Sequence, residues 1–175
     1  GIDSFALLAI PFFILSGELM NKGGVAHRLV AFAKALVGFL PGGLALINVI
    51  SAMLMGSVAG SAMASASAMG SILGPEMEKE GYSKGFGVAI NITSATTGLV
   101  IPPSNILIVY SLASGGASIA ALFLAGYIPG LLTGLFLMAV AMIWAKKKNF
   151  KTGKRAPLKT VFGSFVSAFP SLMLL

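Results

Sequence analysis

Two short segments of this apolar chain combine the residue types that can bind a small cation. The first is Gly56-Ser57-Val58-Ala59-Gly60-Ser61, and the second is Thr96-Thr97-Gly98-Leu99-Val100-Ile101-Pro102-Pro103-Ser104. Glycine and proline interrupt helices and free main-chain carbonyl oxygens, to which the serine and threonine hydroxyls add side-chain oxygens. Neither segment contains the carboxylates that divalent cations prefer. The oxygens therefore suit a monovalent cation, and sodium is the natural candidate.

The second segment also offers groups that attract negative charge. A helix expected to begin at Ser104 or Asn105 would direct its first N–H groups toward the same region. Helix amino termini favour anionic groups. The pattern thus predicts a cation together with a carboxylate, and the alternative is that both breaks are only structural kinks.

The composition places these breaks in a membrane. The chain is 57% hydrophobic and 10% charged, with a mean hydropathy of +0.95, whereas soluble domains contain about 25% charged residues. Irregular backbone at membrane depth must lie inside protein or line a polar cavity, and paired broken helices are typical of secondary transporters. With no cysteine in the chain, disulfides and thiolate metal sites are excluded.

The net charge of +7 does not indicate a nucleic-acid partner. Seven of the twelve basic residues lie between Lys146 and Lys159, directly after an apolar run, where cytoplasmic loops of membrane proteins are basic. If this loop is cytoplasmic, Lys22, Arg28 and Lys34 are also cytoplasmic only when the intervening hairpin returns to its own side. The charge pattern therefore favours a re-entrant hairpin.

The predicted fold is all-α and integral to the membrane, with discontinuous helices. Runs 44–55 and 62–73 are too short to cross a bilayer and are expected to form the re-entrant hairpin around the first break. The remaining expected helices are a membrane helix over 5–20, an interfacial amphipathic helix over 25–39, half-helices over 86–95 and 105–112, a short helix over 117–124, and a complete crossing over 126–145.

These elements group into four parts. They are a membrane helix and cytoplasmic arm helix (1–40), a transport part (41–116) with the hairpin at 42–75 and the broken helix at 83–114, a scaffold-type helix with a basic cytoplasmic loop (117–158), and the truncated start of a second half (159–175).

Other features receive structural interpretations. Gly126, Gly130 and Gly134 form G-x-x-x-G repeats that predict close helix packing, with a moving or dimerising contact as the alternative. His27, the only histidine, is expected at the surface, and Glu18 either lies within the membrane or pairs near the interface. An intramembrane enzyme is disfavoured because no nucleophile has an identifiable base.

Three stretches resemble the large membrane subunit of TRAP (tripartite ATP-independent periplasmic) transporters. They are IPFFILSGELMNKGG (10–24), GSVAGSAMASASAMGSILGPEMEKEGY (56–82) and TSATTGLVIPPSNILIVY (93–110). The resemblance extends over nearly the whole chain and would cover the first half of a subunit built from two inverted repeats.

The resemblance implies a sodium-coupled, elevator-type importer of the bacterial inner membrane. Its expected partners are a periplasmic binding protein that delivers an organic acid, a separate or fused small membrane subunit, and the lipid bilayer. No cofactor is implied, and sodium is the coupling ion. Two rival interpretations are a related sodium/dicarboxylate carrier that needs no binding protein and a non-transporting helical membrane scaffold.

Carried over position by position, the resemblance also implies site residues. Many family members have an aspartate where this chain has Ser65, which weakens an ion-binding role for that position. The second repeat lies outside this chain, so these residues alone do not complete a substrate site. The implied sodium ligands are Ser57, Gly60, Ser61, Thr97, Gly98, Ile101 and Pro103, and the implied substrate contacts are Ser61, Thr96, Ser104 and Asn105.

Overall fold

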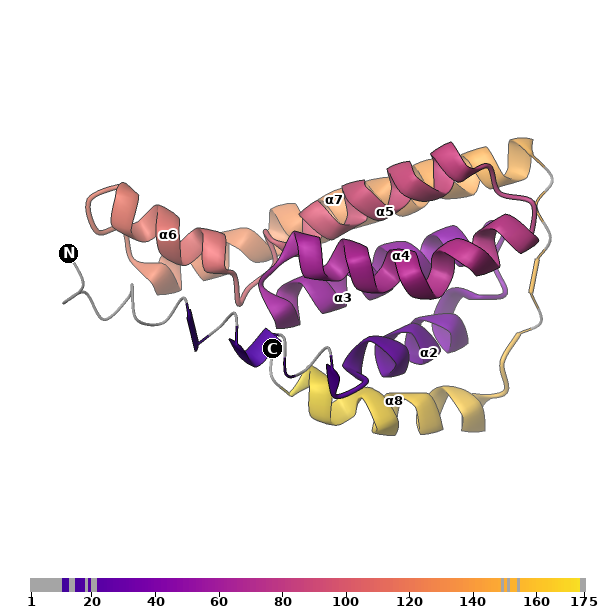
Figure 1. Cartoon of the computed structure of the whole chain (residues 1–175), viewed down its shortest axis with the longest axis horizontal. Coiled ribbons are helices and arrows are strands. Elements are labelled where there is room, and N and C mark those ends of the chain that lie inside the picture. Colours follow the sequence, from indigo (N-terminus) through magenta and orange to yellow (C-terminus); the bar gives the residue numbers. More distant parts are fainter. Residues whose placement is uncertain are drawn as a thin grey trace.

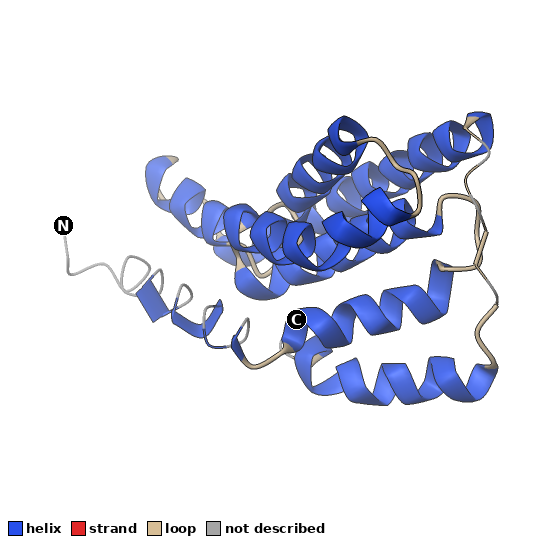
Figure 2. Ribbon diagram, turned by 45° about the vertical axis from the view of Figure 1, so that its right-hand side comes forward, coloured by secondary structure: helices blue, strands red, loops and turns tan. Residues whose placement is uncertain are grey.

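Every regular element in the described part of the protein is a helix, as predicted (Figure 2). The structure is a computed structural model that describes residues 11–12, 15–17, 19, 22–148, 150, 152–153 and 155–173. Glu18 and much of the membrane helix predicted over residues 5–20 lie outside these residues.

The first labelled helix, α2 (Val25–Val37), is amphipathic as predicted. Leu29 and Ala33 are fully buried, whereas His27, Arg28 and Lys34 are exposed. Its partner is α8 (Leu158–Leu172), which lies beside it in Figure 1. The two helices form an outer layer against one side of α3.

Helices α3 (Gly43–Ala59) and α4 (Ala62–Lys79) form the predicted hairpin, but its turn is shorter than expected. Only Gly60 and Ser61 leave helical geometry. Gly60 has φ +59°, which glycine adopts without a steric penalty, and Ser61 caps α4 by accepting the Ala64 N–H. The prediction of a break from Gly56 onward is therefore wrong, because the helix continues through Gly56 and Ser57.

The lengths of the hairpin helices also differ from the prediction. They contain 17 and 18 residues, where the sequence predicted about twelve each. Helix α4 does not end at Gly74-Pro75 but includes Pro75 and reaches Lys79. At about 1.5 Å per residue each helix is roughly 26 Å long, close to the thickness of a bilayer core.

The second break separates α5 (Lys84–Gly98) from α6 (Asn105–Ala113). Residues 99–104 are non-helical, as predicted, but Thr96, Thr97 and Gly98 belong to α5. Pro102 and Pro103 have no N–H to donate to the carbonyls of Gly98 and Leu99, and this prevents the helix from continuing.

Helix α7 (Ile119–Lys147) is a single helix and not the predicted pair of segments. Among the described residues it is the one helix long and apolar enough to cross a membrane. Side chains of Ile101 and Met53 occupy the space beside Gly130 and Gly134, so the predicted close packing is observed. Its buried residues are all glycine or alanine, namely Gly126, Gly130, Gly134, Ala141 and Ala145.

Helix α3 occupies the middle of this arrangement (Figure 1). One apolar core lies between α2, α3 and α4, and a second joins α3 to α5 and α7. Near the second core, the rings of Phe86 and Trp144 stack in parallel with centroids 4.3 Å apart. The packing of α3 on α5 and α7 holds the turn of the hairpin beside the break between α5 and α6.

Candidate functional site

The hairpin turn and the second break lie in direct contact, as a shared site requires. A β-carbon built on Gly60 would lie 2.9 Å from Nδ2 and 3.3 Å from Oδ1 of Asn105. One turn earlier, a β-carbon on Gly56 would lie 2.8 Å from the α-carbon of Gly98. Glycine at positions 56 and 98 therefore allows the backbones of α3 and α5 to touch.

Four helix ends meet in this region. Helices α3 and α5 end at Ala59 and Gly98, while α4 and α6 begin after Ser61 and Ser104. The last carbonyls of a helix carry partial negative charge and its first N–H groups partial positive charge. The site thus presents groups for a cation and for an anion side by side.

The residues predicted as sodium ligands occupy different environments within the site. Ser57 is buried and its hydroxyl donates to the Leu54 carbonyl at 2.9 Å, so its side chain points back along α3. Thr97 is buried and donates to Thr93 at 3.0 Å. The side chain of Ile101 packs beside Gly130, which leaves only its main-chain oxygen for an ion.

The predicted substrate contacts also occupy different environments within the site. Ser61 and Ser104 are the capping residues of α4 and α6, and each accepts an N–H from the first turn of its helix. Asn105 follows Ser104 and lies against Gly60. Thr96 is the most exposed of the predicted contacts, and its hydroxyl donates to the Thr93 carbonyl.

Asn105 carries the most informative polar atom of the site. Within the described part of the chain, its buried Oδ1 has no hydrogen-bond partner. An unpaired buried acceptor is unfavourable unless something outside the protein chain satisfies it. A cation fits this oxygen, and no cluster of three His, Cys, Asp or Glu side chains that would suit a transition metal occurs among the described residues.

Sequence reasoning missed a buried polar network next to the site. Ser94 Oγ donates to Asn48 Oδ1 at 3.0 Å, and Asn91 Nδ2 donates to the Ala66 carbonyl at 2.7 Å. These contacts link α3, α4 and α5. The signal that could have found them is an asparagine within an apolar helix, where an amide needs a partner.

Ser65 also connects the hairpin helices to each other. Its hydroxyl is fully buried and donates to the Ala52 carbonyl of α3 at 2.9 Å. The structure thus gives Ser65 a packing contact between α3 and α4.

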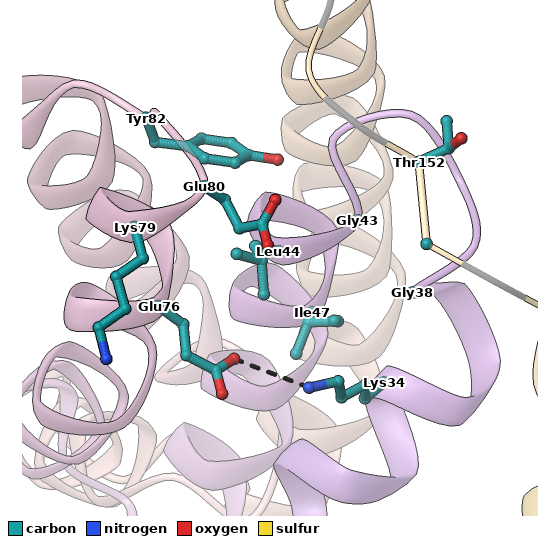
Figure 3. Close-up of a pocket in the computed structure, with 11 residues that line it drawn as sticks. Lys34, Gly38, Gly43, Leu44, Ile47, Glu76, Lys79, Glu80, Tyr82 and Thr152 are labelled. Atoms are coloured by element: carbon teal, nitrogen blue, oxygen red, sulfur yellow. Dashed lines mark ion pairs between the residues drawn. The ribbon is translucent and has the colours of Figure 1, made fainter.

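A separate charged cavity lies at the other end of the hairpin. Its volume is about 540 Å³, and it is lined by Lys34, Glu76, Lys79, Glu80 and Tyr82 together with residues 152–153 (Figure 3). Lys34 and Glu76 form an ion pair of 3.8 Å across it. Burial, with a smaller contribution from Glu80, raises the pKa of Tyr82 to about 12, so its hydroxyl stays protonated at neutral pH. Segments predicted to share the cytoplasmic side therefore come together here.

Comparison with known proteins identifies the family. The family model described as "Tripartite ATP-independent periplasmic transporter, DctM component" matches residues 1–175. The chain belongs to this family. The TRAP permease family consists of transporter subunits, so the chain is not an enzyme.

Two of the similar proteins carry TRAP permease names. The chain is 43% identical over 173 residues to the C4-dicarboxylate TRAP transporter large permease protein DctM of Pseudomonas aeruginosa, and 40% identical over 173 residues to the sialic acid TRAP transporter large permease protein SiaM of Vibrio cholerae. Each match covers 99% of this chain and 40% of the relative. A Salmonella typhimurium protein named YgiK is 56% identical over 175 residues, again 40% of its length. The chain thus spans about two fifths of the length of these curated relatives.

Proposed function

We propose that the subunit containing this chain imports an organic acid together with sodium, and that a periplasmic binding protein delivers the acid. The observation that carries this proposal is the unpaired Oδ1 of Asn105, which lies beside Gly60 where the hairpin turn meets the second break. The proposal includes a small membrane subunit, placement in the bacterial inner membrane, and an elevator motion.

The proposed sodium ligands are mostly oxygens of the main chain. Gly60 and Ser61 contribute from the turn, and the carbonyls of Gly98 and Ile101 contribute from the break, where no helix N–H competes for them. Asn105, expected from the sequence to contact substrate, is added as an ion ligand because an amide oxygen without a donor suits a cation.

The proposed anion site is formed by the first turns of α4 and α6. Their capping residues, Ser61 and Ser104, satisfy one N–H of each first turn, and the first two N–H groups of each helix have no intrahelical acceptor. A substrate carboxylate would bind there, next to the sodium ion. The names of the relatives, C4-dicarboxylate and sialic acid transporters, are compatible with an organic acid.

The proposed moving part includes the hairpin and the broken helix. The contact between Gly56 and Gly98 and the hydrogen bonds from Asn91 and Ser94 join α3, α4 and α5 into one packed unit. Such a unit can carry the ion and substrate together. Re-entry of the hairpin, which the basic residues favour, would leave its turn at the depth of the site.

Uptake by reconstituted transporter tests the proposal. The full-length permease, its small subunit and the purified binding protein are placed in liposomes, and uptake is measured with and without a sodium gradient. Asn105→Leu keeps the branched shape of the side chain but replaces Oδ1 and Nδ2 with methyl groups, and it should abolish sodium-dependent uptake, whereas Ser114→Ala on the exposed end of α6 should leave it unchanged. Equal uptake with and without the sodium gradient would reject the sodium coupling. Uptake in the absence of the binding protein would favour a carrier that acts alone.

A further inference from the structure

The charged cavity has no part in the proposed sodium site. It lies between α2, the start of α3 and the end of α4, at the opposite end of the hairpin from Gly60. The charged side chains that line it are two cations and two carboxylates, Lys34, Lys79, Glu76 and Glu80, so their formal charges cancel. A lining that holds both signs without a net charge favours a ligand that also carries both signs over a simple anion or cation.

One wall of the cavity suits a negatively charged group. Gly43 and Leu44, the first two residues of α3, line it, and the preceding Gly42 has no side chain with which to cap that helix end. The N–H groups in the first turn of a helix carry partial positive charge. Lys34 of α2 reaches the same cavity (Figure 3) and adds a full positive charge. These groups together suit a phosphate.

Another wall suits a positively charged group. Helix α4 ends here, and the last carbonyls of a helix carry partial negative charge. The carboxylates of Glu76 and Glu80 line the cavity at this helix end, and among the described residues neither forms an ion pair with Lys79. Glu76 and Lys34 approach only to 3.8 Å with side chains 50% and 61% exposed, so their ion pair is weak. A ligand with a phosphate and an ammonium group would enter this pair and give each side chain a closer partner.

Aromatic side chains indicate that the cavity lies at the depth of lipid headgroups. Tyr82, which lines the cavity, stacks on Phe150 with ring centroids 3.9 Å apart, and Phe86 stacks on Trp144 at 4.3 Å. Tyrosine and tryptophan are enriched at membrane–water interfaces. Trp144 also belongs to the last turn of α7, the candidate membrane span, which ends at Lys147. The ligand of the cavity is therefore expected to come from the membrane surface.

We propose that the charged cavity binds the phosphoethanolamine headgroup of a zwitterionic membrane phospholipid. Lys34 and the start of α3 would hold the phosphate, and the carboxylates at the end of α4 would accept hydrogen bonds from the primary ammonium group. Leu44 and Ile47 give the cavity an apolar part that suits the beginning of the acyl chains. The inference depends on membership of a membrane-protein family and not on the sodium site.

Thermal stability in defined lipids tests the proposal. The full-length permease with its small subunit is purified in detergent, and its Tm is measured after addition of phosphatidylethanolamine, phosphatidylcholine or phosphatidylglycerol with identical acyl chains. Phosphatidylethanolamine should raise the Tm by about 4 °C more than either other lipid, because it alone carries both a phosphate and an ammonium group that donates hydrogen bonds. Equal shifts with the three lipids would overturn the proposal. An equally large shift with water-soluble phosphoethanolamine would overturn the membrane as the source of the ligand.

Matched variants test whether the lipid binds in this cavity. Glu80→Gln and Lys34→Gln should each weaken the affinity for phosphatidylethanolamine about tenfold in a native mass spectrometry titration, because each removes one charged partner of the headgroup. Glu78→Gln and Arg28→Gln are the controls. Glu78 lies two residues before Glu80, Arg28 lies on α2 with Lys34, and both are exposed but do not line the cavity. Unchanged affinity in the two cavity variants, or an equal loss in the controls, would overturn the inference and leave sodium-dependent uptake as a separate question.

Discussion

Gly56 and Gly98 lie back to back where α3 crosses α5, and a β-carbon on either would come within 2.8 Å of the α-carbon of the other. The crossing brings the end of α5 against the last turn of α3, directly before Gly60. Each glycine is therefore needed for contact between two backbones and not for a turn. The contact holds the last turns of α3 and α5, and with them the two breaks, side by side.

Gly98→Ala should destabilise the subunit by about 1–3 kcal/mol, because the new methyl group would lie 2.9 Å from the Ala52 carbonyl oxygen and 2.8 Å from Gly56. The measurement is the Tm of the purified full-length protein. Gly163→Ala is the matched control, since no described atom lies within 4 Å of its added β-carbon. Equal stability of the two variants would contradict the close crossing.

Thr97 is among the sodium ligands that the family resemblance implies, so Thr97→Val should raise the sodium concentration for half-maximal uptake about tenfold, which corresponds to roughly 1.4 kcal/mol for one weakened ligand position. Thr133→Val is its matched control. Both hydroxyls donate to the carbonyl four residues earlier, Thr97 to Thr93 and Thr133 to Pro129, but Thr133 is exposed on α7. A similar sodium dependence in both variants would remove Thr97 from the ligands that the resemblance implies.

The sequence predicted the helical class and the two breaks, but it placed both breaks too early. Gly56, Gly60 and Gly98 are all glycines in small-residue segments that predict a break, but only Gly60 leaves the helix. The difference depends on tertiary contact: Gly56 and Gly98 face each other, whereas Gly60 has a positive φ. A single sequence without its contacts does not distinguish these two uses of glycine.

For the candidate site, the sequence predicted that the two segments meet, which the contact of Gly60 with Asn105 confirms, but it did not give the side-chain directions. Ser61 caps α4 at the first break, and Ser104 caps α6 at the second break. The helix amino terminus predicted at Ser104 or Asn105 is therefore present. Ser57 and Ile101 were predicted from their position in the breaks, yet the Ser57 hydroxyl bonds within α3 and the Ile101 side chain packs on α7. Rotamers and neighbours decide these directions, and neither is encoded in spacing alone.

Ser65→Ala should destabilise the subunit by about 1 kcal/mol, the typical value of a buried hydrogen bond, because the Ala52 carbonyl loses its donor. Ser67→Ala, two residues along the same helix, is the matched control and should change stability by less than about 0.5 kcal/mol, since Ser67 is exposed. Chemical or thermal denaturation of both variants gives the comparison. A larger effect at Ser67 would contradict the packing of α4 on α3.

Labelling of single cysteines tests the topology on which the proposed depth of the site depends. Lys79 lines the same charged cavity as Lys34 and residues 152–153, and all three segments are predicted to be cytoplasmic. Ser114 is exposed after α6 and is predicted to lie on the opposite side. In a full-length background without other cysteines, a membrane-impermeant maleimide applied to intact cells should label Ser114→Cys and not Lys79→Cys, while disrupted cells should label both. External labelling of Lys79→Cys in intact cells would overturn the predicted topology, because the charged cavity that Lys79 shares with Lys34 and residues 152–153 would then lie outside the cell.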